Sequence, residues 1–441
     1  MPAQFGDLAR LRALMAAGGV RRLVAKRLAP NDNSKNQIYL GGGFEALNIL
    51  PFGEIYEDSS EKNQILKAPL NFRWLQPDGT HAPAPHAQLI LYPQYPEVRM
   101  SGFLKGARNA PNDLMTVRQA GRVLFLGIDD AGAITAAVVP PNDALAREFE
   151  AAVAVQGERV FYEIAVGAAI VDTRMPLLTQ LKRIHRLGWI NSKRLHGDGS
   201  VGPCEAPHCG GYTLEAELGV KPNGFSEPDY LGWEVKQHGV TNIEKPTSGG
   251  PITLMTPEPT GGFYKEKGVE AFLRKYGYAD RQGREDRINF GGIYRVGVPV
   301  ELTGLTMVLD GYNAGTGKLT DSTKGITLLD PKGNAAAVWG YTGLIKHWAR
   351  KHERAVYVPS LMRAEPVRQY QYGGSILLGQ GTDFFRFLKA MAAGHIYYDP
   401  GIKLEGASTK NPKTKRRSQF RVRLQQLAGL YARAEQTSLT D

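Results

Sequence analysis

The segment Pro-Asp-Tyr-Leu-Gly-Trp-Glu-Val-Lys, residues 228–236, constrains the fold more than any other part of the chain. Its second half is aromatic and β-branched, which predicts a strand, and residues two apart on a strand face the same side. Glu234 and Lys236 are therefore expected on one face. Asp229 stands five residues before Glu234, and on an unbroken strand this odd spacing would put it on the opposite face. A bend must intervene, and the sequence predicts it at Gly232 because glycine inside a strand pattern marks bulges and turns.

This bend would give the segment the ligands of a metal site. Asp229, Glu234 and the backbone carbonyl of Val235 would converge on one hard divalent cation. Lys236 would point at the same position and orient or deprotonate a water there, for attack on a phosphodiester. The alternative is a solvated strand face, because short charged patterns of this kind also arise by chance.

The flanking segments extend the pattern. Residues 211–219, Gly-Tyr-Thr-Leu-Glu-Ala-Glu-Leu-Gly, predict a short helix that ends at a glycine. Glu215 and Glu217 lie about 200° apart around such a helix, so they cannot share one role. Residues 251–259, Pro-Ile-Thr-Leu-Met-Thr-Pro-Glu-Pro, predict a strand followed by a proline stop.

The order and spacing of these three motifs resemble the MvaI/BcnI restriction endonucleases, which are relatives of the nicking enzyme MutH. The motifs are Thr-Leu-Glu-x-x-Leu-Gly, Pro-Asp-Tyr-x-Gly-x-Glu-x-Lys and Ile-Thr-Leu-x-Thr-Pro-Glu-Pro, and the resemblance runs from about Leu177 to about Tyr431. It implies an α/β restriction-endonuclease-like domain of the PD-(D/E)xK type with a central mixed sheet. We expect this catalytic domain to cover residues 174–441.

The resemblance also implies roles for individual residues. Asp229 and Glu234 would bind Mg²⁺, with Mn²⁺ able to substitute, Lys236 would be the catalytic lysine, and Glu215 would complete the acidic cluster. Glu217 has no counterpart and is interpreted as solvated.

The activity implied is that of a type II restriction endonuclease, which cleaves both strands of a short sequence in double-stranded DNA. Such an enzyme acts as a monomer and has a cognate DNA methyltransferase as its genetic partner. A nicking or modification-dependent MutH-like nuclease is the first alternative. A sequence-specific DNA-binding protein without catalysis is the second.

Positive charge is confined to the part of the chain that carries these motifs. The chain has 54 Lys and Arg against 43 Asp and Glu, and residues 1–175 hold 18 of each kind, so the whole excess lies in residues 176–441. A cationic surface gathers a polyanion by releasing its counterions. The late basic segment supplies candidate DNA contacts, with a solvated loop as the alternative: Lys410, Lys415, Arg416 and Arg417.

Residues 1–173 predict a separate DNA-binding domain. A helix is expected at Leu8–Ala17, followed by short strands separated by Gly, Pro, Asn and Asp, which favours a small all-β barrel. The region from about 20 to 130 resembles the N-terminal effector domain of the restriction enzyme EcoRII, a pseudobarrel, and this implies that the protein binds two DNA copies. Amide-rich and basic turns give candidate contacts, although turn chemistry alone would also place them there: Lys26, Arg27, Asn31, Asn33, Lys35, Asn36, Arg99 and Lys105.

Hydropathy and cysteine content suggest a soluble, cytoplasmic protein of a bacterium or archaeon. No apolar run approaches the roughly 18 residues of a membrane span, and a signal-peptide core is missing from the N-terminal segment. Cys204 and Cys209 are interpreted as free thiols, with a structural zinc site as the open alternative.

Overall fold

A computed structural model describes residues 5–30, 36–58, 65–156, 158–166, 173–206, 208–221, 228–246, 249–349 and 351–440. The chain divides into two compact units, Met1–Asp172 and Thr173–Asp441, which are called unit 1 and unit 2 below. Asn31, Asn33 and Lys35, three of the candidate DNA contacts, lie outside the described residues. Within the described ranges, no helix is both long and apolar enough to cross a membrane.

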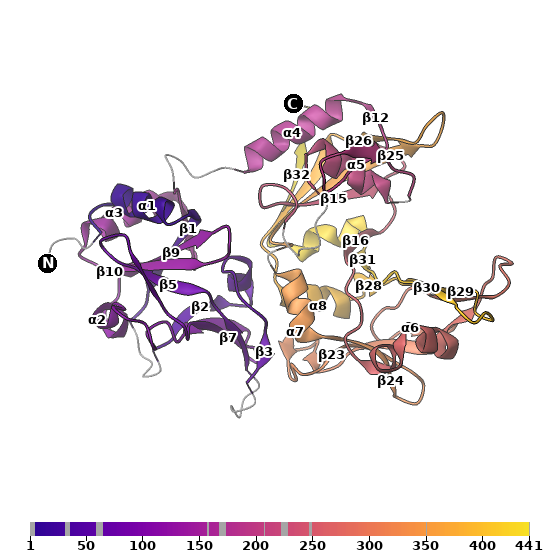
Figure 1. The fold of residues 1–441 in the computed structure, drawn as a ribbon, viewed down its shortest axis with the longest axis horizontal. Coiled ribbons are helices and arrows are strands. Elements are labelled where there is room, and N and C mark those ends of the chain that lie inside the picture. The colour runs from indigo at the N-terminus through magenta and orange to yellow at the C-terminus, as the bar shows by residue number, and fades with distance from the viewer. Residues whose placement is uncertain are drawn as a thin grey trace. The chain divides into compact units, whose positions relative to one another are not determined.

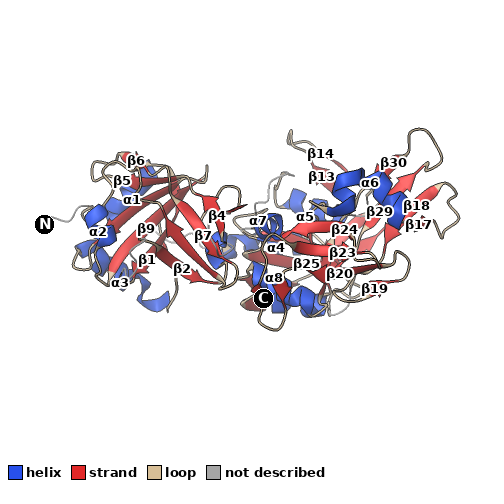
Figure 2. Ribbon diagram, turned by 90° about the horizontal axis from the view of Figure 1, so that it is seen from below, coloured by secondary structure: helices blue, strands red, loops and turns tan. Residues whose placement is uncertain are grey.

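Unit 1 consists mainly of strands, with helices at its start and near its end (Figures 1 and 2). In chain order its elements are α1 (Leu8–Ala17), β1 (Val20–Leu28), β2 (Ile38–Gly42), η1 (Glu45–Asn48), β3 (Tyr56–Glu57), β4 (Leu66–Pro69), β5 (Phe72–Leu75), β6 (His81–Pro83), β7 (Gln88–Tyr92), β8 (Glu97–Ser101), α2 (Asn112–Thr116), β9 (Arg122–Asp129), β10 (Ile134–Val139), α3 (Ala144–Val153), η2 (Ala154–Gln156) and β11 (Tyr162–Ile164).

These strands form two sheets, in the orders β11-β1-β9-β10-β5-β6 and β2-β8-β7-β4-β3. β10 and β5 are parallel, and the other pairs in both sheets are antiparallel. Apolar side chains of α1 and α3, among them Leu11, Met15 and Phe149, pack on the first sheet around Phe125. The helix expected at Leu8–Ala17 is confirmed, whereas α3 was not predicted. The closure of these sheets into a pseudobarrel stays a prediction.

Unit 2 contains helices and several small sheets in addition to one larger sheet. In chain order its elements are α4 (Arg174–Arg186), β12 (Trp189–Asn191), β13 (Lys193–Leu195), β14 (Val201–Pro203), α5 (Cys209–Glu217), β15 (Glu234–Gly239), β16 (Ile252–Met255), α6 (Gly262–Tyr276), β17 (Tyr278–Ala279), β18 (Arg287–Gly291), β19 (Pro299–Val300), β20 (Leu305–Leu309), β21 (Tyr312–Asn313), β22 (Lys318–Leu319), β23 (Gly325–Leu329), β24 (Ala335–Gly340), α7 (Tyr341–Trp348), β25 (Arg354–Arg363), β26 (Gln369–Tyr372), β27 (Ser375–Gln380), α8 (Phe384–Ala392), β28 (Ile396–Tyr398), β29 (Gly401–Glu405), β30 (Lys413–Lys415), β31 (Phe420–Val422), α9 (Leu424–Leu427), η3 (Ala428–Leu430) and β32 (Arg433–Ser438).

The larger sheet has the order β12-β26-β25-β27-β32, and β15 pairs with β25 as well. β15 runs parallel to β25, from Glu234 opposite Ala355 to Gly239 opposite Ser360, while β26 and β27 are antiparallel to β25. Val235 faces the apolar core that this sheet forms with α4 and α5. Side chains alternate along a strand, so Glu234 and Lys236 leave the other face of β15.

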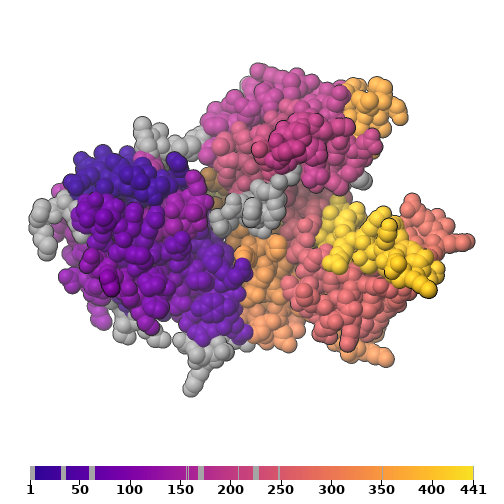
Figure 3. All heavy atoms as spheres, in the orientation of Figure 1, coloured from indigo at the N-terminus to yellow at the C-terminus, as the bar shows by residue number. Residues whose placement is uncertain are grey.

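An aromatic cluster joins two of the smaller sheets of unit 2, through β24 of one sheet and through β28 and β31 of the other. The ring of Trp339 contacts the rings of Tyr398 and Phe420, with centroids 4.6 and 5.4 Å apart. The Pro257 carbonyl accepts hydrogen bonds from Trp339 Nε1 and from Ser418 Oγ, at 3.0 and 2.6 Å. These hydrogen bonds connect the aromatic cluster to the Thr-Pro-Glu-Pro segment that follows β16. β16 is the strand that the sequence predicted within residues 251–259. In Figure 3, the yellow segment with β29 and β30 projects at the edge of unit 2, beside β18, with which β29 pairs.

Candidate active site

A two-residue turn brings Asp229 next to β15. Tyr230 and Trp233 exchange backbone hydrogen bonds of 2.9 and 2.8 Å, and the two residues between them have positive φ, 50° at Leu231 and 80° at Gly232. Positive φ at both central positions is the geometry of a tight hairpin turn, and glycine adopts it without steric cost. The Asp229 carboxylate then accepts a hydrogen bond of 3.0 Å from the Val235 amide. The predicted bend at Gly232 is confirmed.

Glu234 is a buried carboxylate between two lysines. Its side chain is 1% exposed, and its Oε1 lies 2.6 Å from Lys236 Nζ and 3.5 Å from Lys351 Nζ. Its other oxygen, Oε2, is shielded from solvent and has no hydrogen-bond partner among the described residues. A buried carboxylate oxygen without a partner is costly, so this atom is one to which a ligand is expected to bind.

Burial and neighbouring charges shift the proton affinities of this group. Burial raises the pKa of Glu234 to about 7, with Asp229 adding to the rise and Lys236 opposing it. The pKa of Glu215 is also raised, first by burial and then by the charge of Asp229. Burial by itself would lower the pKa of Lys236, but the carboxylate of Glu234 outweighs it, and the net pKa lies above the usual lysine value. Lys236 therefore remains an ammonium at neutral pH.

These side chains line one pocket of about 400 Å³ in unit 2. α5 contributes Glu215, the turn contributes Asp229, and β15 contributes Glu234 and Lys236. The structure thus brings together the four residues that the sequence analysis proposed as catalytic. The rest of the lining is Arg194, Tyr212, Val220, Lys221, Val235 and Lys351.

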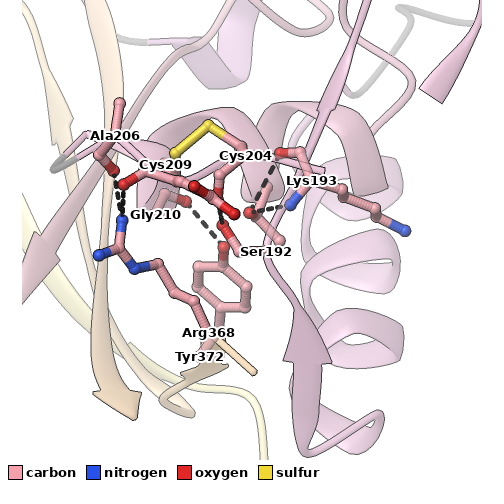
Figure 4. Close-up of a disulfide and its surroundings, with 10 residues drawn as sticks. Ser192, Lys193, Cys204, Ala206, Cys209, Gly210, Arg368 and Tyr372 are labelled. Atoms are coloured by element: carbon pink, nitrogen blue, oxygen red, sulfur yellow. Dashed lines mark hydrogen bonds between the residues drawn. A yellow bond between two sulfur atoms is a disulfide. The ribbon is translucent and has the colours of Figure 1, made fainter. Parts of the chain in front are cut away.

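A disulfide fixes the segment that leads into α5 (Figure 4). Cys204 and Cys209 are bonded, and Cys209 is the first residue of α5 and fully buried. The carbonyl of Cys204 accepts a hydrogen bond from Ser192 Oγ, and the Arg368 guanidinium donates to the carbonyls of Glu205 and Ala206. The interpretation of the cysteines as free thiols is wrong, because the fold places them within bonding distance. No zinc cluster of His, Cys, Asp or Glu occurs in the described part of the chain.

Glu217 is not solvated, contrary to the interpretation from the sequence. Its carboxylate is 10% exposed and pairs with Lys193 at 2.5 Å and with Arg183 at 3.2 Å. It lies on the side of α5 away from Glu215, as their angular separation predicted. Glu217 therefore ties α4, α5 and β13 together, and it does not line the pocket.

Five residues of the pocket were not found from the sequence: Arg194, Tyr212, Val220, Lys221 and Lys351. Lys351 precedes β25, and only the pairing of β25 with β15 places it beside Glu234. That pairing joins segments more than a hundred residues apart, and no local pattern records it.

The basic segment of unit 2 forms part of the β29–β30 hairpin. Lys410 is exposed in the loop, and Lys415 on β30 is 3.0 Å from Glu405 on β29. Arg416 is exposed, and Arg417 lies against Gly401. The structure places all four on one projecting hairpin, and contact with DNA stays a prediction for each.

The unit 1 candidates surround two cavities. Lys26, Asn36 and Arg99 line one of about 240 Å³, and Asn36 and Lys105 line another of about 600 Å³. Burial lowers the pKa of Lys26 to about 8. Arg27 has partners within the fold, since it pairs with Glu150 at 2.6 Å and stacks on Tyr162. These residues are brought together apart from Arg27, but DNA contact stays a prediction for them too.

The pocket thus gathers three carboxylates and Lys236 around the start of β15. The sequence profile of the MvaI/BcnI restriction endonuclease family matches residues 178–431. The chain belongs to the MvaI/BcnI restriction endonuclease family.

Two solved structures are similar to the chain at low identity. The restriction endonuclease MvaI in complex with its cognate DNA has a TM-score of 0.45 at 17% identity, over 61% of this chain and 99% of that one. MvaI in the absence of DNA has a TM-score of 0.34 at 17% identity, over 62% of this chain and 100% of that one. No curated protein matches the chain.

Proposed function

We propose that this protein is a Mg²⁺-dependent, sequence-specific endonuclease of the type II restriction class that cleaves double-stranded DNA. The observation that carries the proposal is the buried Oε2 of Glu234, which has no partner among the described residues and lies in the pocket with Asp229, Glu215 and Lys236. Membership of a restriction endonuclease family supports the reaction class.

The pocket residues fit a divalent cation of the magnesium type. No three His, Cys, Asp or Glu side chains in the described ranges are placed to hold a metal on their own. Mg²⁺ does not require them, because it keeps several waters and uses one or two carboxylates together with substrate phosphate. Asp229 and Glu234, with the Val235 carbonyl, would hold it, and Mn²⁺ would substitute. When bound, the cation would polarise the phosphodiester and offset charge on the leaving oxygen.

The protein side chains then have separate roles. Lys236, which remains an ammonium, donates hydrogen bonds to the attacking water or to the phosphate and stabilises the charge that develops there. Glu215 borders the pocket, and burial followed by the charge of Asp229 raises its pKa, which makes its carboxylate a stronger proton acceptor than an ordinary glutamate.

The proposal extends to unit 1 as a second DNA-binding site. Its two cavities gather Lys26, Asn36, Arg99 and Lys105, and amide and cationic side chains of this kind contact base edges and phosphates. A monomer with this unit would bind a target and an effector duplex together. A cognate methyltransferase would protect the host sequence.

Digestion of plasmid DNA tests the function directly. We expect the wild type with Mg²⁺ to cut unmethylated plasmid in both strands at a defined sequence, and Asp229→Ala to lose at least a thousandfold in rate. Arg186→Ala, which removes an exposed charge of α4 outside the pocket, serves as the folded control. Strand-resolved products that are only nicked, or cleavage of methylated plasmid alone, would favour the MutH-like alternative. Site-specific binding without cleavage would favour a DNA-binding protein.

A further inference from the structure

The pocket also contains an arginine, Arg194, which forms no ion pair among the described residues but whose charge opposes the rise that burial causes in the pKa of Glu215. Arg194 is the middle residue of β13, which pairs with β14 opposite Gly202. The neighbouring Lys193 amide donates to Thr213 Oγ1 at 3.0 Å, and the same oxygen donates to the Lys193 carbonyl at 3.2 Å. Thr213 is a fully buried residue of α5. The backbone next to Arg194 is therefore fastened to the helix that carries Glu215.

Strand geometry directs Arg194 into the pocket. Successive side chains of a strand point to opposite sides, and Lys193 is occupied by Glu217 at 2.5 Å. Arg194 lines the pocket, and its guanidinium carbon lies 4.4 Å from the ring centroid of Tyr212. Tyr212 stands three residues before Glu215 on α5, so both face the same side of the helix. The Tyr212 ring thus supports the guanidinium from one side at a fixed position.

The guanidinium of Arg194 has an N–H group that is not used in a hydrogen bond within the described residues. Its Nε is shielded from solvent and has no hydrogen-bond partner among the described residues, and Arg194 forms no ion pair within those ranges. The two lysines nearest Glu234 are both engaged by that carboxylate. Four cations line the pocket against three carboxylates, Glu215, Asp229 and Glu234. The lining therefore has an excess positive charge, and Arg194 is a planar donor that is not neutralised by an ion pair.

Phosphate is the ligand that this arrangement fits. A guanidinium presents its N–H groups as a rigid fork that matches two phosphate oxygens, and stacking on an aromatic ring fixes the plane of the fork. Arg194 pairs with neither Glu234 nor Asp229, where cleavage is proposed to occur. The lysines Lys236 and Lys351 are already paired with Glu234, so Arg194 is the cation of the lining that is placed to bind a neighbouring phosphate.

We propose that Arg194 binds a backbone phosphate next to the scissile one, and that Tyr212 is the positioning residue beneath it. This inference rests on the proposed endonuclease function. It adds a substrate contact that lies outside the Asp-Glu-x-Lys motif and that belongs to the β13–β14 hairpin. The contact fixes the DNA strand in register with Lys236.

Single-turnover cleavage of a duplex with a mapped cut site tests the inference. We expect Arg194→Ala to slow cleavage by about tenfold to a hundredfold, the range of one lost charge-assisted contact. Arg194→Lys should recover only part of that loss, because an ammonium lacks the fork. Tyr212→Leu should slow cleavage less than Arg194→Ala, and Tyr212→Phe should remain close to wild type. Arg186→Ala, which removes the same charge from an exposed position on α4, should stay within about twofold.

A methylphosphonate scan identifies the phosphate. Each phosphate flanking the cut is replaced in turn by a neutral methylphosphonate, and rates are compared for wild type and Arg194→Ala. At one flanking position the wild type should lose about as much as Arg194→Ala does, and the variant should lose nothing further. If the loss caused by Arg194→Ala and the loss caused by the methylphosphonate multiply at every flanking position, the inference is overturned. It is also overturned if Arg194→Ala cleaves the unmodified duplex within twofold of the wild-type rate. Neither result affects the proposed endonuclease function. A wild type that cleaves no duplex overturns the proposed function and this inference with it.

Discussion

The proton affinity of Glu234 links the geometry of the pocket to its chemistry. The carboxylate is buried beside Lys236 and Lys351, and its pKa of about 7 means that it is largely protonated in mildly acidic solution. A protonated carboxyl is a poor ligand for a divalent cation, so the proton and the cation compete for the same oxygens.

A pH dependence of cleavage follows from this competition. The pKa of Glu234 is raised, so the ionised form is lost as pH falls through about 7. At subsaturating Mg²⁺ we expect the single-turnover rate to fall by up to about tenfold per pH unit below that value. Saturating Mg²⁺ should move the midpoint to lower pH because the cation displaces the proton.

Stopped reactions from pH 8.5 to 5.5 at two Mg²⁺ concentrations measure this. Arg186→Ala, exposed on α4 and outside the pocket, should show the wild-type profile. A rate that is independent of pH between 8 and 6 at low Mg²⁺ would contradict the assignment of Glu234 as a cation ligand.

Individual residues differ in how far the sequence could place them. Asp229, Gly232, Glu234 and Lys236 could be placed because their relation is local, since an odd spacing, a glycine and a strand pattern together require one bend. Arg194 and Lys351 could not, because strand pairing and the β13–α5 contact bring them to the pocket from distant segments. The disulfide was missed for a different reason: two cysteines five residues apart do not show whether the intervening chain turns back.

At the scale of elements, the turn before β15 and the start of α5 position the acidic residues. Gly232 has φ of 80° with no atom within 4 Å of an added Cβ, and Gly211 in α5 also has open space around it but helical φ. The same substitution therefore has opposite consequences at the two positions.

Gly232→Ala should lower the free energy of unfolding by about 1–2 kcal/mol, because a Cβ disfavours left-handed backbone. Gly211→Ala should raise it by roughly 0.5–1 kcal/mol, because alanine restricts the unfolded chain and favours helix. Equilibrium denaturation followed by tryptophan fluorescence compares the two variants with wild type. Equal shifts in the same direction would show that the turn does not need the glycine.

The disulfide should stabilise the segment before α5. Cys204 and Cys209 close a short loop, and loop-closure entropy predicts about 2 kcal/mol. A reducing agent should lower the unfolding midpoint of wild type, whereas the Cys204→Ser, Cys209→Ser double variant should show the lowered midpoint with or without reductant. Mass measurement after alkylation of the native protein counts the free thiols. Two alkylated cysteines in protein kept free of reductant would contradict the bond.

At the scale of the whole molecule, the two units differ in charge. Residues 1–175 are balanced, and the excess of Lys and Arg lies in residues 176–441. Unit 2 should therefore supply most of the salt-dependent attraction to DNA. Because unit 1 has no excess charge, its contact with DNA would depend instead on a few individual side chains that line its cavities. Lys105 is one of them and is exposed.

Stimulation by a second DNA copy distinguishes these contributions in the full chain. If unit 1 binds an effector, a short duplex carrying the mapped site, added in excess, should speed cleavage of a single-site plasmid by about fivefold or more. Lys105→Ala should weaken the stimulation and leave the unstimulated rate unchanged, because that rate depends on unit 2. Arg118→Ala, which removes a charge from an exposed position of unit 1 outside both cavities, should be stimulated as wild type is. A duplex that only slows cleavage, by competing for the pocket of unit 2, would show that unit 1 is not an effector site.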